Sequence, residues 1–308
     1  MSYRIKKILL AIASPGARKA IVRTAQIARR CNAQVELFSA VRPAAQVVAS
    51  RAQALRLSKA RLEEKLAELD GVANRLREDG IRVSCAAELG YSAAEAILER
   101  VKVTRPDLVV IEAHKHNLLA RLMLSQTDFE LIRHCPVPLL VVKSAAPSAG
   151  RPVVLAALDP WHVSGKPSNL DSHLAEVAHG IAQGLGGKLH GAHVHAPLMR
   201  YEADSVMAPV VVPVPVSEQK AFVRSVRQRF RAEGKRFEIS PQNLHLRMGD
   251  PGLELPALVR KLKVDTLVMG AVARSTLSRV LIGSTAERVL DALPCNALVV
   301  KPKGFRER

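Results

Sequence analysis

DLVVIEAHKHNLLARLMLSQTDFELIRHCPVPLLVVK (residues 107–143) and DTLVMGAVARSTLSRVLIGSTAERVLDALPCNALVVK (residues 265–301) align without a gap, 158 residues apart. Both segments begin with an aspartate before an apolar run, and both close on Leu-Val-Val-Lys. Matched pairs between these ends are Leu119 and Leu277, Arg121 and Arg279, Thr127 and Thr285, and Pro136 and Pro294. Self-similarity of this length indicates that the chain contains two copies of one structural unit.

Short runs of Val, Leu and Ile alternate with helical stretches in both copies. We expect strands at 6–13, 33–41, 81–88, 107–112 and 138–142, then at 152–158, 187–195, 242–248, 265–270 and 296–300. These runs are too continuous to alternate in polarity, which is typical of parallel strands buried on both faces. The sequence therefore predicts an α/β fold. It consists of two tandem doubly wound five-stranded parallel-sheet units, packed as an intramolecular pseudo-dimer.

The second copy carries more residues between its strands than the first. We place the first unit at 1–146 and the second at 151–303, with an insertion at about 197–217. The insertion includes VMAPVVVPVPV, whose prolines exclude a regular helix or a central strand. Its valines are expected to pack over the crevice or against the other unit, and a self-association patch is the alternative.

Composition limits the class of protein. Of the 308 residues 48% are hydrophobic but only 3% aromatic, so the core must be aliphatic. No apolar run is long enough to span a membrane, and the apolar stretch near the N-terminus fits a first strand better than a signal peptide. The four cysteines are scattered without a Cys-x-x-Cys pair, which favours a reducing cytoplasm.

The formal net charge of +18 is spread over both halves. Such a surface attracts nucleic acid or acidic membranes. Single-strand binders, however, use stacking aromatic residues, and these are scarce here. A dedicated nucleic-acid role is therefore not favoured, although the charge leaves it open.

A glycine-rich pattern follows the fourth strand of the second copy. The pattern is a glycine, two residues, a second glycine, nine residues, and then Gly-Ser or Gly-Thr. This chain keeps that spacing with Gly270, Ala273 and Gly283-Ser284, so alanine replaces the second glycine. With the tandem repeat and the closing Pro-x-x-x-Leu-Val-Val-Lys, the chain resembles the universal stress protein family, and in particular its tandem UspE type. The nucleotide-binding branch of that family carries this spacing.

The resemblance implies an ATP-class ligand and assigns its contacts. Asp159 would read the adenine, and Gly283, Ser284 and Thr285 would hold the phosphates. The remaining implied contacts to adenine and ribose are Val194, Met269 and Gly270. The chemistry is consistent, because a helix N-terminus offers free N–H groups and partial positive charge to phosphate oxygens.

Two features argue against nucleotide binding. Ser284 with Glu287 forms a capping-box pattern, which explains the motif without a ligand. If the Ala273 position needs a positive φ, its Cβ costs about 1–2 kcal/mol. ATP binding by the second unit is thus left open. In the first unit Ala13, Glu112, Lys115 and Ser125-Gln126 occupy the motif positions, and no ATP binding is expected there.

Two histidine clusters offer weaker candidates for a metal site. His114 and His116 follow the first unit's fourth strand, whereas His193 and His195 lie two apart on a strand and share a face. No cysteine or carboxylate stands beside them at ligand spacing, so crevice-lining polar residues are the alternative, and no metal is expected.

No catalytic constellation is recognisable, so we do not expect an enzyme, although slow incidental ATP hydrolysis is not excluded. The expected function is a cytoplasmic stress-response protein that acts by binding a ligand, as a monomeric pseudo-dimer or a homodimer. One alternative is a non-nucleotide scaffold for a lipid-like or protein partner. The other is a metal-dependent enzyme built on the histidines.

Overall fold

The computed structural model describes residues 3–13, 17–44, 50–113, 124–144, 151–160, 169–202, 210–270 and 283–305. For residues 201, 202, 210 and 211 it describes the backbone alone. The fold, the core and most of the candidate site lie within these ranges.

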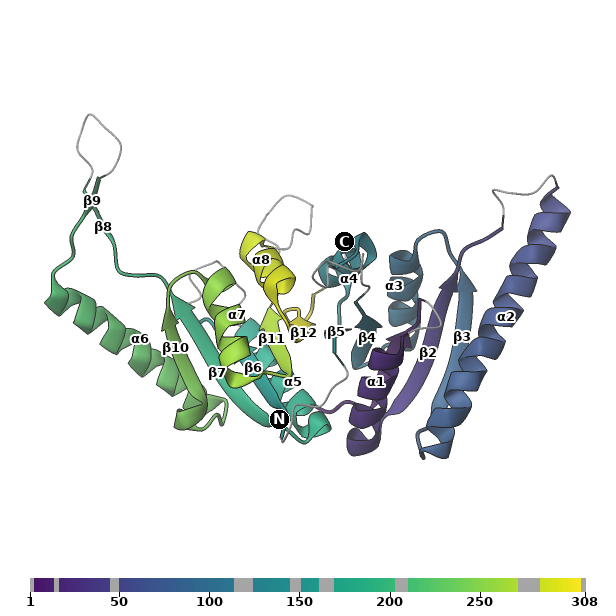
Figure 1. The fold of residues 1–308 in the computed structure, drawn as a ribbon, viewed down its shortest axis with the longest axis horizontal. Helices are drawn as coiled ribbons and strands as arrows, with labels where there is room; N and C mark the ends of the chain where they lie inside the picture. The colour runs from purple at the N-terminus through teal and green to yellow at the C-terminus, as the bar shows by residue number, and fades with distance from the viewer. Residues whose placement is uncertain are drawn as a thin grey trace.

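A ten-stranded sheet runs through the whole molecule (Figure 1). Its order is β10-β7-β6-β11-β12-β5-β4-β1-β2-β3. The first unit contributes β1 (Lys7–Ala11), β2 (Gln34–Val41), β3 (Val83–Leu89), β4 (Leu108–Glu112) and β5 (Leu139–Val142). The second contributes β6 (Val153–Ala157), β7 (Lys188–His195), β10 (Leu244–Met248), β11 (Thr266–Gly270) and β12 (Asn296–Val300). All ten predicted strands are present, and within each unit they pair in parallel, which confirms the predicted fold.

Helices cover both faces of the sheet (Figure 1). One layer holds α1 (Arg18–Cys31), α2 (Arg51–Glu78), α5 (Leu170–Leu185) and α6 (Val216–Arg236). The other holds α3 (Ala93–Thr104), α4 (Gln126–His134), α7 (Pro251–Leu262) and α8 (Ser284–Ala292). A short 3-10 helix, Pro241–Asn243, precedes β10. None of the helices in the described ranges is long and apolar enough to cross a membrane.

Each strand supplies side chains to both layers, because successive residues point to opposite faces. In β1, Ile8 and Leu10 join the cluster that includes α1 and α5, whereas Leu9 joins the cluster that includes α3 and α7. All three are fully buried. The core is built mainly from Val, Leu, Ile and Ala, as the composition predicts.

The two units join through their fifth strands. β5 and β12 pair antiparallel, with Leu140 opposite Leu298, and so merge two parallel half-sheets into one. The Asn296 side-chain oxygen accepts hydrogen bonds from the backbone N–H groups of Lys143 and Ser144, both at 2.9 Å. This junction is the predicted intramolecular pseudo-dimer.

Helices α1 and α5 pack against each other across the same junction. A Cβ added at Gly184 of α5 would lie 3.1 Å from the Cys31 sulfur of α1, so the glycine allows this close approach. The guanidinium of Arg23 in α1 donates to the Asp265 carboxylate of the other unit at 2.8 Å, and both side chains are almost completely buried. The units therefore share polar as well as apolar contacts.

The insertion forms a hairpin that projects beyond the sheet (Figure 1). Its strands are β8 (Arg200–Glu202) and β9 (Val210–Val212), which pair antiparallel; residues 203–209 lie outside the described ranges. Val214, just after it, is buried, whereas Val216 is 65% exposed. The prolines leave room for only a three-residue strand.

Candidate functional site

A cavity of about 780 Å³ lies at the carboxyl ends of β6, β7 and β11. Helices α6, α7 and α8 complete its wall, together with the segment that follows β7. In a doubly wound fold this is the crevice that binds ligands, because the strand order reverses there. The site is thus located by topology, independently of any one residue.

The structure brings the predicted nucleotide contacts together around this cavity. The residues predicted from the motif that line it are Asp159, Val194, Met269, Gly270, Gly283, Ser284 and Thr285. They come from three strands and from the start of α8, which are far apart in sequence. Ala273 lies outside the described residues. That the gathered residues bind a ligand stays a prediction.

Asp159 stands directly beyond β6, where the chain leaves the sheet. Its backbone N–H donates to the Asp171 carboxylate at 3.1 Å. Asp171 lies in the first turn of α5 and is buried. Because this hydrogen bond ties the loop to a helix, Asp171 positions the backbone that carries Asp159. Sequence reasoning missed Asp171, although an acidic residue in a first helical turn was a visible signal.

Helix α8 presents its N-terminus to the cavity without a side-chain cap. The expected capping box of Ser284 and Glu287 is wrong, because Gly283 is the N-cap and has no side chain. The Glu287 N–H donates to the Gly283 carbonyl, the first hydrogen bond of the helix. The N–H groups of Ser284, Thr285 and Ala286 precede that bond and have no acceptor within the helix. This end of α8 thus suits an anion.

The equivalent helix of the first unit is capped by its own side chains. The Ser125 hydroxyl accepts from the Asp128 N–H at 3.1 Å, and the Asp128 carboxylate accepts from the Ser125 N–H at 2.8 Å. Gly283 and Ala286 stand at these two positions in the second unit. A carboxylate therefore already occupies the N-terminus of α4 that an anionic ligand would need.

Glu112, which takes the place of Gly270 in the first unit, brings a second carboxylate to a helix N-terminus there. Its carboxylate accepts a hydrogen bond from the Ala20 N–H in the first turn of α1, at 2.9 Å. Glu112 therefore supplies the anion at the N-terminus of α1, which agrees with the expectation that the first unit does not bind ATP. In the second unit a Cβ at Gly270 would lie 2.8 Å from the Leu170 side chain. The packing of β11 against α5 is therefore enough to favour glycine at position 270, with or without a ligand.

His193 and His195 line the cavity, and their rings stack with centroids 6.3 Å apart. Each donates Nδ1–H to a backbone carbonyl, His193 to Leu158 at 3.0 Å and His195 to Ala196 at 2.9 Å. These bonds fix the ring orientations at the crevice mouth. His114 and His116 lie outside the described residues. In the part of the chain that is described, no group of three or more His, Cys, Asp or Glu is arranged to hold a metal.

A third histidine of the same strand pairs elsewhere. The Nδ1 atom of His190 lies 2.9 Å from Nε2 of His245 on β10. Burial lowers the pKa of both imidazoles, and the neighbouring His245 adds to this effect on His190. The three histidines of β7 are therefore divided between two places. Sequence alone does not reveal the pairing, since it depends on the register of β7 against β10.

One side of the cavity is apolar, and sequence reasoning did not find it. It is formed by Leu198, Met199, Phe222 and Val226. Phe222 and Val226 lie one turn apart on α6, directly after the insertion. An apolar pair at that spacing predicts a buried helix face but not what the face covers. Of the valines expected to cover the crevice, Val212, Val214 and Val216 are not among its lining residues.

Comparison with known proteins gives a consistent result. The model of the universal stress protein family matches residues 4–143 and again 154–301. The universal stress protein E homolog of Haemophilus influenzae is 29% identical over 214 residues, 68% of this chain and 66% of that protein. Universal stress protein E of Escherichia coli K12 is 28% identical over 223 residues, 69% of this chain and 66% of that protein. The chain therefore matches just under two thirds of the length of these relatives.

Solved structures match over nearly the whole chain. A functionally unknown protein from Pseudomonas aeruginosa aligns with a TM-score of 0.75 and 25% identity, covering 97% of this chain and 93% of that one. A universal stress protein from Archaeoglobus fulgidus aligns with a TM-score of 0.66 and 16% identity, covering 96% and 98%; at that identity the likeness shows the fold alone. Universal stress protein E is thus among the proteins that the chain is similar to. Two family matches in one chain and two copies of the five-stranded unit lead to one conclusion: the chain belongs to the universal stress protein family, as a tandem member.

Proposed function

We propose that this stress protein binds an ATP-class nucleotide in the cavity of its second unit and acts in the cytoplasm as a binding protein rather than an enzyme. One observation carries the proposal. The cavity gathers Asp159 at one strand end and an α8 N-terminus without a side-chain cap at another. A nucleotide has matching chemistry at its two ends, an amino-bearing base and an anionic phosphate chain.

The proposed arrangement follows from the positions of these groups. The Asp159 carboxylate accepts a hydrogen bond from the adenine amino group, and the Asp171 contact holds its backbone in place. The backbone N–H groups and the side-chain hydroxyls of Ser284 and Thr285 donate hydrogen bonds to the phosphate oxygens. Both residues are exposed at the cavity wall and so accessible to a ligand.

The first unit is proposed not to bind nucleotide. Asp128 binds the N-terminus of α4, where the phosphate oxygens would lie, and Glu112 adds a second carboxylate at the N-terminus of α1. A phosphate placed beside them would meet like charge. We therefore expect one nucleotide per chain.

Isothermal titration calorimetry of Mg·ATP against nucleotide-stripped protein tests the proposal. The expected stoichiometry is one per chain, with affinity reduced at least roughly tenfold in Asp159→Ala, since one hydrogen bond to a charged group contributes more than about 1.4 kcal/mol. Glu112→Ala in the first unit is the matched control and leaves the affinity unchanged. Absence of heat in the wild type, or two bound nucleotides, would contradict the proposal.

Two further experiments test the role of Ala273 and the absence of catalysis. Ala273→Gly restores the second glycine of the family motif and is expected to tighten binding. Release of phosphate from ATP, followed over hours, is expected to match the buffer control because the protein is proposed to bind without catalysis. Turnover that Asp159→Ala abolishes would overturn the non-enzymatic part of the proposal.

The apolar side of the cavity favours a second candidate, a lipid-like ligand. Leu198, Met199 and Phe222 line a wall that the base and phosphates of a nucleotide do not need. In this case a fatty acid binds to the nucleotide-stripped protein. Phe222→Ser then lowers the affinity for the fatty acid, whereas Asp159→Ala leaves it unchanged. The same two variants thus separate the candidates.

A further inference from the structure

The helix that follows the insertion in the second unit carries a continuous basic stripe. Lys220, Arg224, Arg227, Arg231 and Lys235 recur every three or four residues along α6, and all five side chains are exposed. At this spacing they share one side of the helix. With 1.5 Å of rise per residue the stripe is about 22 Å long.

The stripe has little acidic charge around it. The two acidic residues of α6 point to other basic groups: Glu218 pairs with Arg200 at 2.7 Å, and Glu233 with Arg236 at 3.6 Å. Among the described residues no carboxylate lies within ion-pair distance of the five stripe side chains. Their charge is therefore directed at solvent.

The corresponding helix of the first unit shows that this is particular to α6. Both α2 and α6 carry seven basic residues, but α2 has five acidic residues and α6 has two. In α2 the charges pair along the helix, as in Lys65 with Glu68 and Arg77 with Asp70. A general excess of basic residues would affect both helices of the repeat alike. Here the difference comes from loss of acidic residues on one of them.

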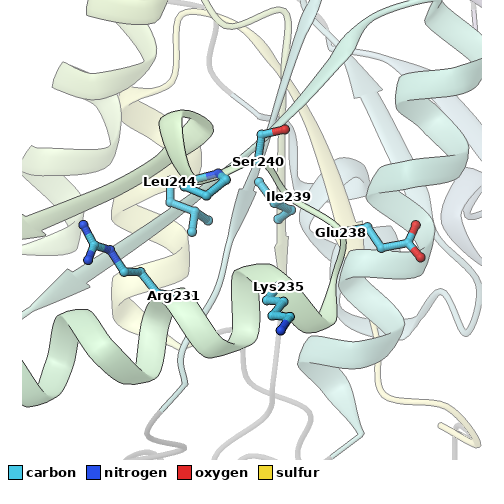
Figure 2. Close-up of a pocket in the computed structure, with 7 residues that line it drawn as sticks. Arg231, Lys235, Glu238, Ile239, Ser240 and Leu244 are labelled. Carbon is cyan, nitrogen blue, oxygen red and sulfur yellow. The ribbon is translucent and has the colours of Figure 1, made fainter.

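A hollow of about 510 Å³ lies at the C-terminal end of the stripe, between α6 and the turn that leads into β10 (Figure 2). Arg231 and Lys235 line it together with Ser240 and Leu244. In Figure 2 Glu238, the one acidic residue there, points away from Arg231. The hollow thus adds a hydroxyl and backbone beside two cations, groups that suit phosphate oxygens.

We infer that this face of α6 binds the phosphate backbone of double-stranded nucleic acid. About 22 Å of duplex carries about a dozen phosphates, enough to meet all five basic side chains. The stripe has no exposed aromatic residue to stack on bases, which single-strand binding uses. Val226 and Phe230 of α6 are buried against the sheet. Among the large apolar side chains described in this helix, exposure is limited to Val216 at its first residue, so α6 has no apolar face available to enter a membrane. The contact is therefore electrostatic and independent of sequence.

Fluorescence anisotropy of a labelled 24-base-pair duplex, measured with full-length protein at several salt concentrations, tests this inference. Five phosphate contacts predict a slope of about −4.5 for the logarithm of the association constant against that of salt concentration. In Arg224→Gln/Arg227→Gln/Arg231→Gln the slope falls to about −2, and affinity at 0.1 M salt drops at least about tenfold.

The matched control is Arg56→Gln/Lys59→Gln/Arg61→Gln on the exposed part of α2, which removes the same charge from the equivalent helix. It is expected to retain nearly the wild-type affinity and slope. If both triple variants lost the same amount of duplex affinity, the inference would be overturned, because the net charge of the protein would then explain binding. Far-UV circular dichroism and thermal unfolding verify that each variant folds.

Two other arms test the choice of partner. Single-stranded DNA of the same length is expected to bind more weakly than duplex, and vesicles with 30% phosphatidylserine are expected to show no dependence on the α6 substitutions. Tighter single-strand binding, or vesicle binding that the α6 variant abolishes while duplex binding persists, would overturn the inference. ATP calorimetry on the α6 variant is expected to be unchanged, because no stripe residue lines the nucleotide cavity.

Discussion

Leu140 lies directly opposite Leu298 across the junction of β5 and β12, and these two leucines are the same residue of the repeated unit, 158 positions apart. On either side, Val141 faces Ala297 and Leu139 faces Val299. The pairing is thus symmetric about the two leucines. A pseudo-two-fold axis passes between them, and it relates the two five-stranded halves of the sheet.

The symmetry breaks at the aspartate that begins each of the two aligned segments. Asp107 accepts hydrogen bonds from the backbone N–H groups of Lys6 and Lys7, at 2.7 and 2.9 Å. The equivalent of Lys6 in the second unit is Pro152, which has no N–H to donate. Asp265 is instead bound by the Arg23 guanidinium of the other unit.

Removal of Arg23 is expected to destabilise the protein strongly. Its side chain is 1% exposed and that of Asp265 is 2% exposed, so Arg23→Met leaves a buried carboxylate without its cation. Such a change costs about 3–5 kcal/mol in the free energy of unfolding, measurable by urea titration. The control Arg200→Met breaks an exposed pair with Glu218 and should cost under about 1 kcal/mol. Similar losses in the two variants would contradict the prediction.

Glycines in two helices of the same layer should respond in opposite directions to alanine. A Cβ at Gly180 of α5 would lie 2.5 Å from the backbone oxygen of Tyr3, whereas a Cβ at Gly71 of α2 meets nothing within 4 Å. We expect Gly71→Ala to raise the free energy of unfolding by up to about 1 kcal/mol, through helix propensity. Gly180→Ala should lower it by about 1–3 kcal/mol, through the steric clash. Stabilisation by both substitutions would show that the N-terminal segment does not pack on α5.

Stability is expected to rise with pH through a buried lysine. Burial lowers the pKa of Lys301 from 10.5 to about 8. Between these values the unfolded chain binds more protons, so the free energy of unfolding increases as pH rises, by at most on the order of 3 kcal/mol. Burial of Cys295, whose pKa is raised to about 12, acts in the opposite direction above pH 9. The clearest window is therefore pH 8–9.

The comparison of wild type with Lys301→Met isolates this lysine. Thermal or urea unfolding at intervals across pH 8–9 should show a larger rise in the free energy of unfolding in the wild type than in the variant. The buried Lys143, whose pKa burial also lowers, contributes to the rise in both proteins. Lys303→Met removes an exposed lysine that pairs with Glu176 and should keep the wild-type pH profile. A rise of equal size in Lys301→Met would assign the pH dependence to another group.

The helix cap of the first unit can be transferred to the second. Gly283→Ser with Ala286→Asp reproduces the Ser125 and Asp128 box at the start of α8. We expect stability to increase by about 1 kcal/mol, because the helix gains a capping box. ATP affinity should fall at least roughly tenfold, because the new carboxylate repels phosphate. Calorimetry and thermal unfolding on the same sample check both outcomes, and unchanged affinity would contradict the proposed phosphate position.

Much of the fold followed from local signals in the sequence. Continuous Val, Leu and Ile runs identified all ten strands, and the gap-free repeat identified the two units. The crevice was predictable because the carboxyl ends of parallel strands meet at one edge of the sheet, which brings Asp159, Val194 and Gly270 together. These predictions depend only on chain-local patterns and on topology.

The remaining features depend on tertiary contacts. The pattern Ser284-x-x-Glu287 resembles a capping box, but the helix begins one residue earlier than the pattern requires, and Glu287 instead lies 3.4 Å from Arg133 of the other unit. The His190–His245 pair depends on strand register, and the apolar cavity wall depends on where α6 packs. No spacing within a single segment encodes these contacts.

The junction of β5 and β12 also has an evolutionary consequence. In a dimer of two identical chains, any substitution appears at both symmetric positions at once, so a change that closes one crevice closes the other. Because this junction lies within a single chain, the two halves mutate independently. Glu112 is thus able to bind the N-terminus of α1 in the first unit while glycine is kept at the equivalent position, Gly270, in the second. Fusion of the two units released each half from the selection acting on the other.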